Sequence, residues 1–205
     1  MSARGSQGEN PLKSARHGAG HGLIDCNMRH VRAIIAVSLM VATMCLALEG
    51  EAIAMKLESS AFTNEGMVPA KYTCDGNDVS PPLTWSGVPG GTKSLALIAD
   101  DPDAPMGEWV HWVVWNIPPS ITALTENISA DRRLDDGMRQ GINDFKRAGY
   151  GGPCPPGGTH RYYFKLYALD ADINLGERAG KSELENAMKG HVLAEAQLMG
   201  RYARK

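Results

Sequence analysis

Residues 93–117 read KSLALIADDPDAPMGEWVHWVVWNI, and this stretch decides the fold class. Its two apolar runs, 93–100 and 109–117, are short and rich in residue types that favour strands. The second run is apolar on both faces and rich in tryptophan, which indicates a central strand. Pro118-Pro119 ends it, because proline cannot donate a hydrogen bond to a neighbouring strand. The stretch therefore predicts two β-strands joined by a polar loop.

Further strand signals surround this stretch. We expect extended segments at Lys56–Phe62, Pro69–Thr73, Leu83–Ser86 and Tyr162–Leu169. Ser182 is expected to cap a helix that runs to about His191, because Glu185 three residues later completes a capping box. Ala194–Ala203 fits either a last strand or a continuation of that helix. The pattern as a whole predicts a mainly antiparallel β protein with one or two peripheral helices.

The composition excludes several functional classes. The 21 Lys and Arg residues nearly balance the 23 Asp and Glu residues, and no block of like charge occurs, which argues against a nucleic-acid binder. Within residues 55–205 no His-x-x-x-His or Cys-x-x-Cys spacing indicates a metal site. The sequence also lacks a P-loop, a dinucleotide fingerprint and a Gly-x-Ser-x-Gly motif. We therefore expect neither a metal nor another cofactor.

The first 54 residues differ from the rest. Residues 1–30 are polar, and two arginines then precede an apolar run at 33–48. Ala52-Ile53-Ala54 comes next and fits the small-residue pattern of a signal-peptide cleavage site. We expect residues 1–54 to form a signal peptide or N-terminal extension and residues 55–205 to form one domain. Cleavage after Ala54 would place that domain in the periplasm or outside the cell.

Three alternatives for this segment stay open. The apolar run could be an uncleaved membrane anchor. Translation could begin at Met28, which would shorten the polar region before the apolar run. It could also begin at Met55, which would leave the domain in the cytoplasm.

The domain contains two cysteines, Cys74 and Cys154. In an exported protein such a pair suggests a disulfide, which would close a loop of about 80 residues and contribute about 4 kcal/mol to stability. Two separate buried thiols are the alternative. Residues 131–159 form a connection longer than usual, and we expect the disulfide to keep it ordered.

Polar side chains fall near the ends of three predicted strands. Side chains alternate across a strand, so each of these strands has one face that is apolar except near its end. The three faces comprise Leu95, Leu97, Ala99 and Asp101, then Trp109, His111, Val113 and Trp115, then His160, Tyr162, Phe164 and Leu166. Where the strand ends are neighbours, their polar groups form a small pocket with an apolar floor.

Such a pocket favours anion recognition. Protonated imidazoles, a tyrosine hydroxyl and backbone N–H groups donate hydrogen bonds, and the Asp101 carboxylate can orient one histidine and raise its pKa. The glycine-rich segment 151–158 can bring backbone close to a ligand. The plainer interpretation is that His111 is a satisfied core residue and that residues 101–105 form a simple turn.

Three segments carry a resemblance to a known family. They are DPDAP at 101–105 with EWVHW at 108–112, GGPCPP at 151–156 with GTHRY at 158–162, and KYTCDGNDVSPP at 71–82. Their order and spacing resemble the signatures of the phosphatidylethanolamine-binding protein family, in its bacterial Raf-kinase-inhibitor-like branch. The resemblance covers nearly all of residues 55–205.

The resemblance implies a fold and a site. The fold would be two antiparallel sheets packed as a Greek-key sandwich with peripheral helices, and its pocket would bind phosphate, acetate or a phospholipid head group. Matched residue by residue, with the backbone of the glycine-rich segment added, the expected ligand-binding residues are Asp101, Asp103, Trp109, His111, Gly152, His160 and Tyr162.

The leading functional hypothesis is an exported protein that binds small anions or phospholipid head groups. The alternative is a protein-interaction or protease-inhibitor module that docks a partner at the pocket rim. A phosphoester hydrolase would need Asp101 and His111 as an acid–base pair, but the sequence shows no activated Ser or Cys nucleophile beside them. We therefore expect a binding protein rather than an enzyme.

Overall fold

The computed structural model describes residues 54–204. The expected signal peptide, the possible anchor and the upstream start site concern residues 1–53, which lie outside the described part of the chain. Within residues 54–204, none of the helices is long and apolar enough to span a membrane.

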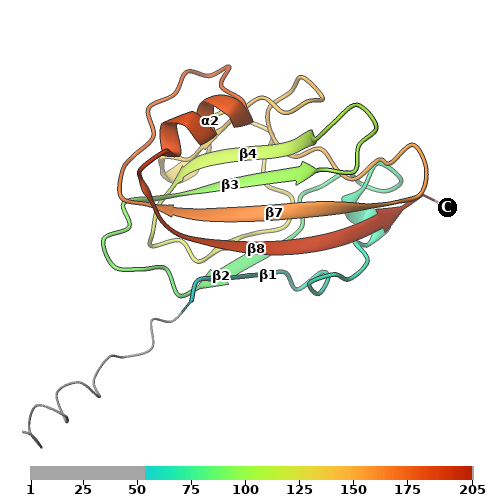
Figure 1. Ribbon diagram of the computed structural model, residues 1–205, viewed down its shortest axis with the longest axis horizontal. Coiled ribbons are helices and arrows are strands. Elements are labelled where there is room, and N and C mark those ends of the chain that lie inside the picture. Colours follow the sequence, from blue (N-terminus) through green and yellow to red (C-terminus); the bar gives the residue numbers. More distant parts are fainter. Residues whose placement is uncertain (1–53, 205) are drawn as a thin grey trace, which may run out of the picture. The chain divides into compact units, whose positions relative to one another are not determined.

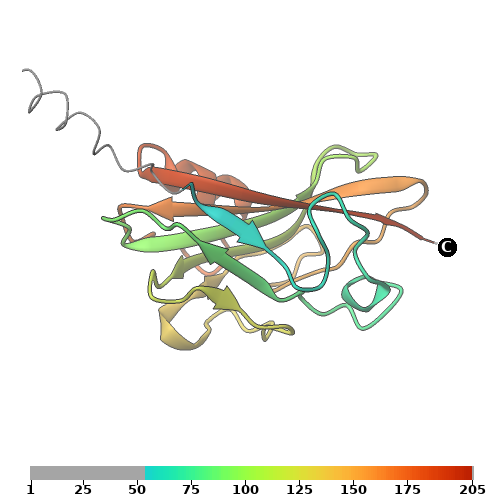
Figure 2. The same cartoon turned by 90° about the horizontal axis from the view of Figure 1, so that it is seen from below.

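Two antiparallel sheets form the framework (Figures 1 and 2). The smaller sheet has the order β1-β2-β5 and the larger sheet the order β6-β4-β3-β7-β8. The strands are β1 Lys56–Glu58, β2 Leu83–Ser86, β3 Ser94–Asp101, β4 Trp109–Ile117, β5 Ala123–Leu124, β6 Arg139–Gln140, β7 Thr159–Leu169 and β8 Val192–Ala203. The order β7-β3-β4-β6 is that of a Greek key, with β5 of the other sheet inserted between β4 and β6. The predicted fold class is confirmed.

The third layer is a single α-helix in the described part of the chain. Figure 1 shows α2, Lys181–Met188, lying on the side of the larger sheet where β3 and β4 are neighbours. Short 3₁₀ turns occur at Ala70–Tyr72 and Asp135–Gly137. Leu184 and Met188, one helical turn apart, are buried against the sheet. Burial of such side chains contributes about 1.5–3 kcal/mol each.

Strand β3 is buried along its whole length because it is covered on both sides. Leu95, Leu97 and Ala99 belong to the core between the two sheets, whereas Ala96 and Ile98 belong to the core beneath α2. This explains why the strand is apolar without alternation. Its last two residues are both acidic, so each face of the sheet receives one carboxylate at this end.

The helix differs from its prediction at both ends, and it stops at Met188 and not near His191. α2 begins with Lys181, and the N–H of Gly180 donates to the Glu183 carboxylate at 3.0 Å. The predicted cap, Ser182, is therefore inside the helix, and Glu185 forms an ion pair with Lys181 at 3.5 Å instead of completing a capping box. The glycine at the preceding position permits the earlier start, because glycine is itself an acceptable cap.

Three other predictions change in detail. The segment 69–73 was expected to be extended, but the N–H of Tyr72 donates to the carbonyl of Pro69 at 3.0 Å and forms a 3₁₀ turn. The first strand stops at Glu58, because Ser59 Oγ accepts the N–H of Ala61 and turns the chain. The C-terminal segment, left open between strand and helix, is the long strand β8.

The long connection after β5 is fixed by buried contacts. Gln140 on β6 accepts a hydrogen bond from Trp112 Nε1 at 2.6 Å, and its amide nitrogen donates to the carbonyls of Ser129 and Asp131. Farther along, Cys154 forms the predicted disulfide with Cys74, with the two Cα atoms 5.4 Å apart.

Candidate functional site

A cavity of about 300 Å³ opens near the polar ends of β3, β4 and β7. It is lined by Asp101, Ala104, Pro105, Met106, Trp109, His111, Phe145, Cys154, Pro155, Pro156 and His160. Its walls are mostly apolar, and its polar groups are one carboxylate and two imidazoles. A hollow of about 350 Å³ between β1 and β8 contains no histidine and offers no comparable chemistry.

His111 reaches this cavity because β4 contains a β-bulge. Asp100 pairs with Val110, and Ala99 pairs with Trp112, so His111 is an extra residue in the ladder. Two successive residues of the bulged strand then oppose one residue of the partner. His111 and Trp112 therefore both face the space between the sheets.

Because of this bulge, the predicted set of residues on one face of the strand is partly wrong. Trp109 and His111 line the cavity, but Val113 and Trp115 lie on the opposite side, in the core beneath α2. The prediction that these four residues share a face is wrong beyond His111, because it assumed uninterrupted alternation. The side chain of Trp112 takes the inward position instead.

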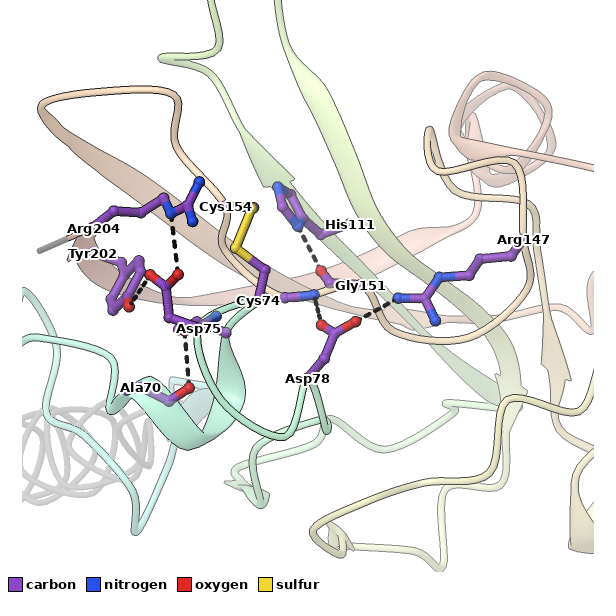
Figure 3. The surroundings of a disulfide bond; sticks show 12 residues. Ala70, Cys74, Asp75, Asp78, His111, Arg147, Gly151, Cys154, Tyr202 and Arg204 are labelled. Atoms are coloured by element: carbon purple, nitrogen blue, oxygen red, sulfur yellow. Dashed lines mark hydrogen bonds and ion pairs between the residues drawn. A yellow bond between two sulfur atoms is a disulfide. The ribbon is translucent and has the colours of Figure 1, made fainter.

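The His111 ring has a defined orientation. Its Nδ1 lies 2.6 Å from the carbonyl oxygen of Gly151, and a carbonyl can only accept, so Nδ1 carries the proton. Figure 3 shows the other ring nitrogen, Nε2, directed away from Gly151. Burial lowers the pKa of His111, and this outweighs the opposite effects of the Gly151 carbonyl and of Asp101. His111 is thus a neutral imidazole with an acceptor nitrogen, which differs from the charged donor expected from sequence.

Asp101 orients the second histidine. Its Oδ2 accepts a hydrogen bond from His160 Nδ1 at 2.7 Å, and its Oδ1 accepts the N–H of Asp103 at 2.8 Å. Both side chains of the Asp101–His160 pair are nearly fully buried. With Nδ1 engaged, the Nε2 of His160 is the ring nitrogen available to the cavity. No group of three or more His, Cys, Asp or Glu side chains in residues 54–204 is arranged to hold a metal ion.

Tyr162 lies between the two histidines. Its ring packs edge-on against His111, with centroids 5.2 Å apart, and stacks on His160 at 6.5 Å. Its hydroxyl is the one buried side-chain polar atom without a hydrogen-bond partner among the described residues. Burial, reinforced by the negative charge of Asp101, raises the pKa of Tyr162, so the hydroxyl keeps its proton and remains a donor.

Three of the expected ligand-binding residues do not line the cavity: Asp103, Gly152 and Tyr162. The Asp103 carboxylate receives the backbone N–H of Arg161 and two guanidinium hydrogen bonds of 2.7 and 2.9 Å. These Arg161 contacts lower the pKa of Asp103 to about 2, so it is a fixed ion-pair partner. Gly152 donates its N–H to Asp78 Oδ1 at 2.6 Å, and a Cβ at this position would lie 2.5 Å from the carbonyl oxygen of Tyr72.

Three apolar residues of the cavity wall, Phe145, Pro155 and Pro156, were not among the predicted site residues. Phe145 packs edge-on against Trp109 and His111, with ring centroids 5.5 and 5.4 Å away. Pro155 and Pro156 line the side nearest the disulfide. The glycine-rich segment signalled a close backbone approach, but nothing in the sequence placed a distant phenylalanine there.

Comparisons with known proteins point to one family. Residues 58–203 match the sequence model described as phosphatidylethanolamine-binding protein. The chain is 56% identical over 150 residues to a UPF0098 protein of Methanothermobacter thermautotrophicus, covering 73% of this chain and 99% of that protein. It is 46% identical over 183 residues to the UPF0098 protein PH1269 of Pyrococcus horikoshii, covering 87% and 91%.

Solved structures agree. The crystal structure of a putative phosphatidylethanolamine-binding protein homolog, CT736 of Chlamydia trachomatis, superimposes with a TM-score of 0.69 at 43% identity, over 74% of this chain and 99% of that one. Escherichia coli YbcL, described as a new member of the mammalian family, gives a TM-score of 0.68 at 36% identity, with the same coverage.

Proposed function

Because this chain belongs to the phosphatidylethanolamine-binding protein family, we propose that it binds small oxyanionic groups, such as phosphate or a phospholipid head group, in the cavity near the ends of β3, β4 and β7. One observation carries this proposal: two imidazoles from different strands each turn a free ring nitrogen toward the same cavity. Tyr162 does not line the cavity, but its ring contacts both histidines, and its unpaired hydroxyl can donate to an oxygen bound between them.

The surroundings favour tight polar contacts. The walls of the cavity are mostly apolar, and hydrogen bonds are electrostatically stronger in such an environment than in water. An unpaired buried hydroxyl costs about 1–3 kcal/mol, so a ligand that accepts from Tyr162 recovers that energy. Apolar walls also suit the carbon part of an amphiphilic ligand.

Export is part of this proposal. The disulfide between Cys74 and Cys154 supports it, because disulfides persist mainly in oxidising compartments such as the periplasm or the extracellular space. A periplasmic or secreted protein would meet phospholipid head groups at a membrane surface.

Binding is favoured over phosphoester hydrolysis. Hydrolysis would need Asp101 and His111 to act as an acid–base pair. Instead Asp101 pairs with His160, and both of its oxygens already accept hydrogen bonds. The partner of His111 is a backbone carbonyl, so no carboxylate is free to take up a proton beside it.

The direct test is an NMR titration of the histidine rings with phosphate and phosphorylethanolamine. We expect the ring signals of His111 and His160 to shift together at millimolar ligand. His191, which forms an exposed pair with Asp170 on the far side of the domain, is the internal control and should not move. Absence of a shift at both cavity histidines would contradict the proposal.

Three substitutions sharpen this test. His111→Ala and His160→Ala should each weaken phosphate binding about tenfold or more, the loss expected when a buried hydrogen-bonding group is removed. Tyr162→Phe should weaken binding similarly without lowering the melting temperature, because its hydroxyl has no partner in the described residues. Loss of folding in both histidine variants would instead identify these residues as core histidines.

A second candidate function rests on the loop between β3 and β4. Met106 lies in this loop, 94% exposed and preceded by Pro105, and Phe145, which lines the same cavity, is 37% exposed. A loop that presents one exposed apolar side chain fits the specificity pocket of a protease, as a protease inhibitor would require.

This second function predicts inhibition of proteases that prefer apolar residues. The full chain should inhibit chymotrypsin or subtilisin, and Met106→Glu should weaken inhibition about tenfold or more, because a charge would enter an apolar pocket. Equal activity of the two proteases with and without the protein would exclude this function.

A further inference from the structure

One peptide group links the cavity to Asp78, a residue that does not line it. The carbonyl of Gly151 accepts the hydrogen bond from His111 Nδ1 at 2.6 Å. The N–H of Gly152, which belongs to the same planar peptide group, donates to Asp78 Oδ1 at 2.6 Å. Arg147 holds the other oxygen, Oδ2, at 2.7 Å. Figure 3 shows Asp78 and His111 on opposite sides of this segment, next to the disulfide.

This arrangement leaves the peptide group one orientation. An ionised carboxylate can only accept, so Asp78 fixes the direction of the Gly152 N–H, and planarity then turns the Gly151 carbonyl toward His111. Neither glycine has room for a side chain, since a Cβ on Gly151 would lie 2.5 Å from Phe145 and one on Gly152 would meet Asp78 itself at 2.7 Å. His111 must therefore carry its proton on Nδ1, and its cavity nitrogen Nε2 is an acceptor.

We propose that Asp78, acting through the Gly151–Gly152 peptide group, makes the cavity select oxyanions that still carry a proton, such as hydrogen phosphate or a phosphate monoester monoanion, over oxyanions that carry none, such as sulfate. The proposal rests on the proposed function and narrows its ligand class: free phosphate and phosphate monoesters fit the site, whereas the phosphodiester of a phospholipid head group, which carries no proton near neutral pH, falls with sulfate. Asp78 is a positioning residue, because it contacts the peptide group and not the ligand.

The physical reason is a match of donors and acceptors. A protonated oxyanion donates its O–H to His111 Nε2 and accepts from the Tyr162 hydroxyl. An oxyanion without a proton places a lone pair against the lone pair of Nε2, and a site built for a hydrogen bond rejects a partner that cannot make it.

Sulfate could be accommodated only if His111 became charged. Three carboxylates act on its ring, from Asp101 and Asp100 on β3 and from Asp78, and they favour the charged form, as does the Gly151 carbonyl. Burial opposes them and prevails, so that the pKa of His111 is lowered. The uncharged neighbours Tyr162 and Phe145 complete the packing around the ring.

The test compares phosphate with sulfate on the full chain at pH 7.5 and constant ionic strength. We expect phosphate to shift the rings of His111 and His160 at a concentration about tenfold or more below that required for sulfate. Lowering the pH through the titration of His111 should narrow this difference, because the charged ring donates to sulfate. In the ligand-free protein, ¹⁵N shifts should show the His111 proton on Nδ1.

Three variants test whether Asp78 determines the preference for phosphate. In Asp78→Ala the preference for phosphate should fall to within about threefold, because the peptide group is freed and the Nε2–H tautomer becomes accessible. Asp78→Asn still accepts the Gly152 N–H and should keep the tautomer, but the His111 titration should move to lower pH because a negative charge is lost. Asp75→Ala is the matched control, since it removes the same charge from the same segment, where Asp75 contacts Tyr202 and Arg204.

The outcomes separate the two claims. No ring shift with either oxyanion overturns the proposed function and the ligand class with it. Equal binding of sulfate and phosphate to the wild type leaves the function standing and overturns the selectivity. Two results would each overturn the role of Asp78. One is a His111 proton on Nε2 in the ligand-free protein; the other is an equal shift of the His111 titration in Asp75→Ala and Asp78→Asn. Both of these readouts remain available if Asp78→Ala does not fold.

Discussion

A variant in which Cys74 and Cys154 are both replaced by serine is expected to lose about 4 kcal/mol of unfolding free energy. The two cysteines are 80 residues apart in sequence, and a cross-link of that span restricts the unfolded chain strongly in the chain-entropy model. Both residues are exposed, so serine at either position leaves no buried cavity. Urea unfolding of the two proteins measures the difference.

The same variant should bind phosphate more weakly. Cys154, Pro155 and Pro156 form one wall of the cavity, and the backbone N–H of Cys74 donates to the carbonyl of Pro153 beside them. Reducing agent provides the control: it should lower the stability of the wild type to that of the variant and leave the variant unchanged. A wild type that keeps its stability under full reduction would contradict the prediction.

The sequence was sufficient to predict the fold because its strands carry strong local signals. The run from Leu95 to Ala99 is apolar on both faces and belongs to the strand covered on both sides, and β4 ends at the proline pair that the sequence marks. The first residue of helix α2 was harder to predict, since a glycine cap such as Gly180 has no side chain that would mark the start of a helix.

The composition of the site was only partly predictable. Strand parity correctly placed Asp101 at the end of an apolar face, and the motifs identified His111 and His160, which line the same cavity. The bulge at His111 broke that parity, because whether a strand carries an extra residue depends on its pairing with β3. Local sequence patterns contain no information about that pairing.

Contacts across long sequence separations were the least predictable part of the site. Asp78 and Gly152 are 74 residues apart, and Phe145 reaches the cavity from a loop without periodicity. In the sequence Asp78 has the features of a turn residue, and its effect on His111 passes through a peptide group that no pattern can assign. Asp100 was not predicted to matter for a related reason, since its lysine partners at 165 and 181 come from distant parts of the chain.

Asp100→Ala is expected to be as damaging as loss of the disulfide. The Asp100 side chain is 0% exposed, and its carboxylate accepts from Lys165 at 2.7 and 2.9 Å and from Lys181 at 2.8 Å. Burial works against the charge of Lys181, but its hydrogen bonds with Asp100 and Glu108 prevail and raise its pKa. Removing the shared partner leaves two ammonium groups beside each other, and breaking a buried pair in this way costs about 3–5 kcal/mol.

The loss should extend to the cavity on the opposite face of the sheet. Lys181 ties α2 to Glu108, the residue before Trp109, and thereby holds the end of the loop whose Ala104–Met106 segment forms a cavity wall. Asp100→Ala should therefore lower the urea midpoint sharply and weaken phosphate binding, whereas Asp103→Ala, which breaks a more exposed pair with Arg161, should affect stability far less. Replacing Asp100 by Leu together with Lys165 and Lys181 by Met should recover much of the stability, since an apolar set leaves no buried charge unpaired. Only the more exposed Glu108 and Glu185 lose their partner. If the triple variant were no more stable than Asp100→Ala, the cost would lie in packing and the charge argument would fail.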